Sequence, residues 1–202
     1  IPVLRSKNGR TGVEFTYSVW LFVDGLKGSN KAKYNTIFNK GDMDYKDNMG
    51  ISRIAGPGLY INEGTNKLKI RMNVFHKDPV STPIGSSDIS DDIEITDIPL
   101  KKWFNVMIRC EGNMVDIFIN GMVVKRHKLT GIPRQNYNKV FLTPTNPFNG
   151  FVSDLRYWNY SMGTNEIFNL ISRGPNTKNL KAEQSLNGTL PRYFSTSWFL
   201  KN

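Results

Sequence analysis

Apolar and polar side chains alternate with a period of two along much of this chain, and that pattern most constrains its fold. Residues 114–119 and 122–128 alternate in this way on either side of Asn120-Gly121. Asn-Gly between two apolar runs is the strongest short-range signal for a β-hairpin, because both residues tolerate a positive φ. Residues 103–111 also alternate, and a turn at Glu111-Gly112-Asn113 follows them. The pattern predicts an antiparallel three-stranded meander over residues 103–128.

Two longer runs extend this prediction. Residues 67–74 alternate Lys, Arg or Asn with apolar side chains, which predicts a strand with one face in water. Residues 13–24 are apolar on both faces, which is typical of a central strand in a two-layer structure. Shorter strands are predicted at residues 36–40, 59–62, 92–95, 139–143 and 151–157, with turns between them that include Gly56-Pro57-Gly58. Many short strands with regular turns predict an all-β sandwich or barrel.

One short helix is predicted, over residues 164–172. Thr164 can cap its start and Gly174-Pro175 ends it. From residue 176 the chain is polar and without periodicity, and then an aromatic cluster follows: Tyr193, Phe194, Trp198, Phe199 and Leu200. An exposed aromatic cluster favours aggregation. We therefore expect a β-sandwich over residues 1–175, and a polar linker and aromatic tail over residues 176–202 that packs on the sandwich or on a partner.

Cysteine and histidine are too scarce for most metal chemistry. Cys110 is the only cysteine, so it forms no intrachain disulfide, and its place in an alternating strand predicts an unreactive core residue. Zinc sites built on cysteine pairs are excluded. Asp42, Asp44 and Asp47 supply oxygen ligands of the kind that a structural calcium ion takes, but without a recognised spacing. No metal site and no other cofactor are predicted.

Charge is distributed unevenly along the chain, whose net charge is +10. Residues 1–100 carry 13 Lys and Arg against 12 Asp and Glu, whereas residues 101–202 carry 14 against 5. The predicted partner-binding residues are the basic residues of an acid-free stretch and the aromatic anchors of the tail: Lys125, Arg126, Lys128, Arg134, Lys139, Tyr193, Phe194 and Trp198. Such a surface is expected to meet an acidic protein, an anionic glycan, an anionic membrane or nucleic acid, unless it serves solubility alone.

An ordered series of motifs carries a family resemblance. The segments are VEFTYSVWLFV (13–23), NTIFNKGD (35–42), GPGLYI (56–61), NKLKIRMNV (66–74), IPLKKWFNVMIRC (98–110), VDIFINGMVV (115–124) and FNGFVSDLRYWN (148–159). Over residues 13–175 the chain resembles the concanavalin A-like lectin/glucanase superfamily in its laminin G-like form. The resemblance implies a jelly-roll sandwich of two antiparallel sheets, in agreement with the periodicity.

A narrower resemblance involves FTYSVWLFV, GPGLYI, IPLKKWFNV, the trailing GPN (174–176) and LPRYFSTSWF (190–199). These segments are similar to laminin G-like proteins encoded by large nucleocytoplasmic DNA viruses. That similarity implies a virion location and a minor, capsid-associated role with capsid or other virion proteins as partners. Some of these proteins carry a hydrophobic N-terminal anchor. Here no apolar run approaches the roughly 20 residues of a membrane helix, so membrane association would require a segment upstream of Ile1.

Enzymatic activity is not predicted. Glucanases of the superfamily place their catalytic carboxylates at alternate positions of one strand. Asp92 and Glu94 share a face in this way, but the order of the residue types differs and a second glutamate is missing. Such a pair on a strand is usually a solvated face. We predict no catalytic residues.

The preferred function is a non-enzymatic structural or interaction module, and the alternative is a lectin-like protein that binds a glycan. A lectin needs an exposed aromatic platform, whereas Trp20, Trp103 and Trp158 fall within strand patterns and are predicted to be core residues. Nucleic acid is disfavoured as a partner because no recognised binding motif accompanies the basic residues. Asn159 and Asn187 lie in glycosylation sequons, which matter only if the chain is secreted.

Overall fold

The structure, a computed structural model, describes residues 2–26, 33–43, 46–62, 64–75, 90–144 and 148–177. The elements in these ranges are β1 (Lys7–Gly9), β2 (Gly12–Val23), β3 (Asn35–Gly41), β4 (Ala55–Asn62), β5 (Lys67–Phe75), β6 (Ser90–Thr96), β7 (Trp103–Glu111), β8 (Met114–Ile119), β9 (Met122–Lys128), β10 (Ile132–Pro133), β11 (Val140–Leu142), β12 (Gly150–Trp158) and α1 (Thr164–Ser172). Every predicted strand and the predicted helix are present. The short strands β1 and β10 were not predicted.

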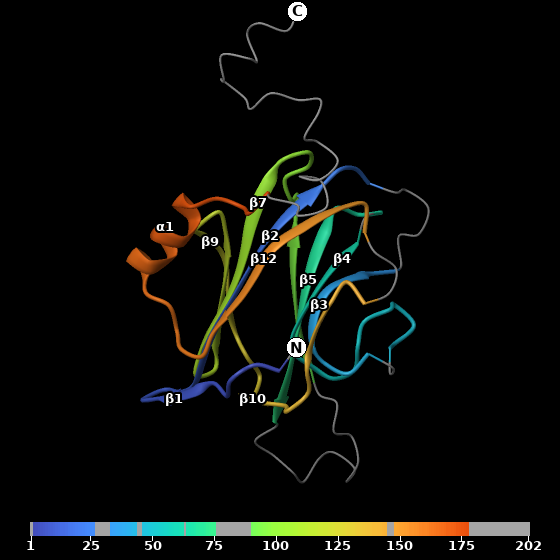
Figure 1. The fold of residues 1–202 in the computed structure, drawn as a ribbon. Coiled ribbons are helices and arrows are strands. Elements are labelled where there is room, and N and C mark those ends of the chain that lie inside the picture. Colours follow the sequence, from blue (N-terminus) through green and yellow to red (C-terminus); the bar gives the residue numbers. More distant parts are fainter. Residues whose placement is uncertain are drawn as a thin grey trace, which may run out of the picture.

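Two antiparallel sheets of six strands each form the layers of a sandwich (Figure 1). The first sheet has the order β1-β2-β7-β8-β9, with β12 also paired to β2. The second has the order β10-β5-β4-β3-β11, with β6 also paired to β5. The predicted fold class, an all-β sandwich with one short helix, is confirmed.

The main core lies between the two sheets, and alternation builds it. Strand β2 buries Phe15, Tyr17, Val19, Leu21 and Val23 in this core, and its other face is on the outside of the sheet because successive side chains point to opposite faces. Since β7 and β12 flank β2, its predicted central position is confirmed. Each fully buried aliphatic or aromatic side chain contributes about 1.5–3 kcal/mol.

The meander over residues 103–128 is confirmed. Strands β7, β8 and β9 pair in sequence, and the Asn120-Gly121 turn has φ values of 50° and 81°. Positive φ at both positions is what the turn chemistry requires. By contrast, Gly56-Pro57-Gly58 is not a turn but part of β4. The β3–β4 pairing shifts register between Asn39 and Gly41, and this irregularity accommodates a proline that has no N–H to donate.

Helix α1 covers the outside of the first sheet (Figure 1). Its buried residues Ile167 and Leu170 pack against Met107 of β7 and Phe118 of β8. The residue at its N-cap is Gly163 rather than the predicted Thr164, and the Gly163 N–H donates to Glu166 Oε2 at 2.9 Å. The acidic side chain of the first turn therefore stabilises the start of the helix, a role the sequence had placed on a threonine hydroxyl.

The polar face of β5 is buried, not in water as predicted. Lys69, Arg71 and Asn73 are each less than a tenth exposed. Residues 46–54 contribute to the cover: Asn73 Nδ2 donates to the Arg53 carbonyl at 2.9 Å, and Arg71 Nη1 donates to Asp47 Oδ2 at 2.9 Å. Alternation correctly divided this strand into two faces, but it carries no information about a distant segment that covers one of them.

Candidate functional site

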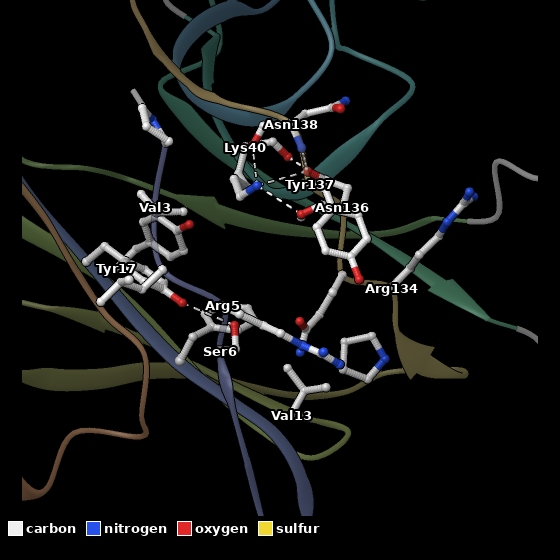
Figure 2. Close-up of a pocket in the computed structure, with 17 residues that line it drawn as sticks. Val3, Arg5, Ser6, Val13, Tyr17, Lys40, Arg134, Asn136, Tyr137 and Asn138 are labelled. Atoms are coloured by element: carbon white, nitrogen blue, oxygen red, sulfur yellow. Dashed lines mark hydrogen bonds between the residues drawn. The ribbon is translucent and has the colours of Figure 1, made fainter.

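A small cavity lies where the N-terminal segment meets the loop between β10 and β11 (Figure 2). Residues 2–6 form one wall and residues 133–138 another, and the start of β2, Lys40 and Tyr157 complete it. The cavity volume is about 110 Å³. An apolar cavity that admits benzene has about 150 Å³. The space therefore suits one small group, such as a carboxylate or a sulfate, better than a whole sugar ring.

Lys40 holds the loop against β3. Its ammonium donates to the Asn136 carbonyl at 2.9 Å, to Asn136 Oδ1 at 3.2 Å and to the Asn138 carbonyl, and Asn136 Nδ2 donates back to the Lys40 carbonyl at 2.9 Å. Burial lowers the pKa of Lys40, because a buried ammonium is poorly solvated. Carbonyl and amide oxygens thus take the place of water around this cation, and among the described residues no carboxylate is bonded to it.

The cavity is electropositive. Among the described residues that line it there are three cations, Arg5, Lys40 and Arg134, and no carboxylate. Arg134 lies with its guanidinium 5.5 Å from the centre of the Phe75 ring. Figure 2 shows Arg5 on the wall formed by the N-terminal segment and Lys40 on the facing side. Charges of one sign around a concave space attract ligands of the opposite sign.

Polar and aromatic groups surround these cations. The Tyr137 side chain is 91 % exposed, on the same loop as Asn136 and Asn138. Ser6 Oγ and the Tyr157 hydroxyl lie 3.2 Å apart in the wall below. Amides and hydroxyls both donate and accept hydrogen bonds, and an exposed ring offers an apolar face. Apart from the charges, these are the groups with which a protein orients a polar ligand.

The structure separates the predicted basic residues. Lys125, Arg126 and Lys128 lie on β9, at an edge of the first sheet. Arg134 and Lys139 flank the loop between β10 and β11, in the second sheet. Of the five, Arg134 alone lines the cavity. Whether the remaining four bind a partner stays a prediction; Lys139 lines a neighbouring hollow together with Tyr137 and Asn138 of the cavity loop.

Arg126 is committed to an ion pair within the sheet. Its Nε donates to Asp116 Oδ1 at 2.6 Å, and Arg109 Nη2 donates to Asp116 Oδ2 at 2.7 Å. The guanidiniums of Arg126 and Arg109 hold the pKa of Asp116 below its usual range. The Asp116 side chain is 7% exposed, so its carboxylate depends on these partners to remain charged.

This ion pair predicts an acid-dependent stability. Because the folded-state pKa of Asp116 is lowered, its contribution is present above the unfolded value of about 3.9 and is lost as the pH falls through the folded value. We expect the urea midpoint to drop between pH 7 and pH 3, and to drop less in Asp116→Asn. Glu111→Gln, an exposed carboxylate on β7, serves as the control. An equal drop in all three proteins would contradict the prediction.

The two carboxylates singled out in the sequence, Asp92 and Glu94, form ion pairs with basic side chains of β5. Asp92 accepts two hydrogen bonds from Arg71, from Nε and Nη2, each at 2.8 Å. Glu94 lies 3.1 Å from the Lys69 ammonium and 3.2 Å from the Tyr34 hydroxyl. Lys69 in particular lowers the pKa of Glu94. A general acid of a glycosidase requires the opposite shift.

The aspartates considered for calcium have other partners where they can be described. Asp47 Oδ1 accepts the N–H groups of Met49 at 3.0 Å and Ile51 at 2.9 Å, and Oδ2 accepts from Arg71. Asp44 lies outside the described residues. Within the described ranges, no group of three or more His, Cys, Asp or Glu residues could hold a metal ion.

Several other predicted residues can be placed or set aside. The Asn159 carbonyl accepts the Lys7 N–H at 2.7 Å, and Asn159 is half-buried just after β12. Trp103 and Trp158 lie half-buried on the outer face of the first sheet and not in the core between the sheets. Asn187, Tyr193, Phe194 and Trp198 lie outside the described residues. In the part of the chain that the structure describes, no helix has the length and apolarity needed to cross a membrane.

Sequence reasoning missed Arg5 and Lys40. Arg5 belongs to a leading segment without periodicity, and Lys40 ends an alternating strand in which a lysine is expected to face water. The one available signal was the basic charge of Arg134 beside the aromatic Tyr137. Local patterns did not indicate that three separate segments converge here.

The chain matches the Laminin_G_3 family, described as the concanavalin A-like lectin/glucanases superfamily, over residues 3–168. It therefore belongs to this family, and the resemblance seen in its motifs is confirmed at that level. Among curated protein sequences, none matches the chain.

Solved structures with a similar fold include receptor-binding domains of botulinum neurotoxins. The domain of the C/D mosaic serotype has 14% identity and a TM-score of 0.56, and the match covers 80% of this chain and 36% of that one. The serotype G binding domain has 16% identity and a TM-score of 0.54, with coverages of 80% and 36%. The chain thus spans little more than a third of these domains. At such low identity the likeness shows the fold.

Proposed function

We propose that the protein is a non-enzymatic binding module whose cavity takes an acidic group of its partner. The observation that carries this proposal is a small space whose described lining residues include the cations Arg5, Lys40 and Arg134 and no carboxylate. An anionic group in this space would form charge-assisted hydrogen bonds with the arginines, which are about twice as strong as neutral ones. Lys40 would attract it through its charge alone, because its three N–H groups are donated to Asn136 and Asn138. The botulinum domains that share the fold are named for receptor binding, which agrees with a binding role.

An acidic protein surface is the partner that we favour. The second half of the chain carries 14 Lys and Arg against 5 Asp and Glu, which would steer such a partner toward it. The resemblance of residues 190–199 to viral laminin G-like proteins supports a capsid or other virion protein as this partner. Cross-linking of purified particles followed by mass spectrometry would identify the neighbours of Lys125, Lys128 and Lys139.

An acidic glycan is the second candidate, because Tyr137 and the neighbouring amides supply a platform and hydrogen-bonding groups. The cavity volume would then accept the carboxylate or sulfate, and the sugar ring would lie outside against Tyr137. The paired state of Asp92 and Glu94 supports binding without hydrolysis.

Calorimetric titration of the full chain at physiological salt tests the proposal. The probes are a hexaglutamate peptide, a sulfated oligosaccharide and the unsulfated oligosaccharide of the same length. We expect saturable 1:1 binding of the peptide and no binding of the neutral sugar. Binding of the sulfated sugar alone would select the glycan candidate. Equal binding of both sugars, or of none of the probes, would refute an acid-binding cavity.

A further inference from the structure

An aromatic strip lies on the outer face of the first sheet, at the opposite end of β2 from the cavity. We define it as Phe22, Trp103 and Phe151. Phe22 is paired with Trp103 on one neighbouring strand and with Phe151 on the other. The centroid of the Phe22 ring lies 5.7 Å from the Trp103 ring centroid and 5.9 Å from the Phe151 ring centroid. Three rings side by side on the outside of a sheet form an apolar surface that water solvates poorly.

This strip is partly open to solvent. Phe151 is 64 % exposed, and Phe22 and Trp103 are half-buried. Helix α1 covers other residues of the same sheet face, Met107 and Phe118 among them, and leaves the strip uncovered. Among the described residues, then, one part of this face has a helix over it and the aromatic part has no such element.

The chain leaves its described part beside this strip. Ser153 Oγ donates to the Asn176 carbonyl at 2.7 Å, so the segment after α1 returns to β12. Ser153 and Phe151 are two residues apart on that strand, which places them about 7 Å apart on the same face. Figure 1 shows the segment after α1 running back from the helix toward β7. The described part ends one residue later, at Thr177.

We propose that the aromatic tail of this same chain, residues 190–200, packs on the aromatic strip. The tail contains Tyr193, Phe194, Trp198, Phe199 and Leu200. Residues 178–192 connect it to Thr177, and 15 residues provide enough chain length to reach the strip from there; a random coil of this length would span roughly 20 Å on average. Such a tether gives an effective concentration in the millimolar range. A tail from a second copy at micromolar concentration would compete poorly.

The association is apolar and not electrostatic. Lys101 and Lys102 are exposed just before Trp103, and residues 178–202 carry Lys178, Lys181, Arg192 and Lys201 against the single acid Glu183. Like charges on the two surfaces oppose docking, so burial of rings must drive it. Added salt should leave the contact intact, whereas salt should weaken an acidic partner in the cavity.

Hydrogen exchange of the full chain tests the proposal. We expect the amides of residues 193–200 to exchange at least tenfold more slowly than free-peptide rates, and to lose this protection in Phe151→Lys. Phe168→Lys is the matched control, because Phe168 is a similarly exposed phenylalanine (55 %) on α1 and outside the strip. Free-peptide exchange in the unaltered chain, or protection that survives Phe151→Lys, would overturn the proposal.

A cross-link distinguishes the occupant of the strip. The variant Lys102→Cys/Ser197→Cys places one thiol next to Trp103 of the strip and the other within the tail. The native Cys110 is fully buried and does not compete. We expect a disulfide-linked monomer under oxidising conditions. Its yield should be the same at about 1 and at about 100 μM protein, because a cross-link within one chain does not depend on the protein concentration. A disulfide-linked dimer would overturn the proposal in favour of a second copy. Neither result depends on the cavity, so each proposal can fail alone.

Discussion

Arg71→Met is expected to lower the free energy of unfolding by about 3 kcal/mol, because removing the shared cation of a buried ion-pair network leaves its carboxylates charged and poorly compensated. Arg71 Nη1 donates to Asp47, and Nε and Nη2 donate to Asp92. The arginine side chain is 10% exposed. Its loss would leave Asp47 without the cation of this ion pair, and would leave Asp92 with the more distant Lys69 ammonium, at 3.5 Å. Urea unfolding at pH 7 measures the effect.

Lys67→Met is the matched control. Lys67 lies on the same face of the same strand, four residues earlier, and its ammonium is 3.5 Å from Glu94. It is a surface ion pair with side chains 36% and 41% exposed, so its loss is expected to cost less than about 1 kcal/mol. Alternation treats the two positions as equivalent. If both variants lost a similarly small free energy of unfolding, the polar face of β5 would be in water, as the sequence predicted.

Arg5→Gln/Arg134→Gln is expected to weaken binding of an acidic ligand roughly 100-fold, because each hydrogen bond to a charged group contributes about 1.5–3 kcal/mol. Both residues line the cavity, and Arg5 comes from the N-terminal segment and Arg134 from the loop after β10. Lys40 is left unchanged because it holds that loop in place. Titration with hexaglutamate, compared with the unaltered chain, measures the loss.

Lys125→Gln/Lys128→Gln removes the same net charge from β9. Because long-range steering is reduced equally in both double variants, a difference between them reports on the cavity itself. We expect the β9 variant to retain most of the affinity. A loss as large as that of the cavity variant would place the acidic partner on the basic surface that sequence analysis predicted.

Much of the fold could be predicted because its signals are local. The meander of β7, β8 and β9 follows from alternation on both sides of Asn120-Gly121, and the turn residues adopt the positive φ that this dipeptide tolerates. The central place of β2 follows from its two apolar faces. The misread segment, Gly56-Pro57-Gly58, is one where turn-forming residues occupy an irregular part of a strand.

Of the residues that line the candidate site, sequence analysis had singled out Arg134. Arg134 was singled out for its charge, but Lys125, Arg126 and Lys128 were grouped with it because they are near in sequence. The chain passes from the first sheet to the second between Lys128 and Ile132, so that group is divided between the layers. Arg126 in addition is engaged by Asp116, a contact across the sheet that charge counting does not reveal.

The strands, the hairpin and the fold class follow from local signals, because periodicity and turn chemistry act over a few neighbouring residues. Which polar residues are buried, and which cations line one cavity, depends on contacts between distant segments. Lys69 and Arg71 are buried because residues 46–54 and β6 contribute carboxylates and cover. Arg5, Lys40 and Arg134 line the same cavity because three segments that are distant in sequence meet there. Such contacts depend on how the sheets pack, and packing between distant segments leaves no period in the sequence.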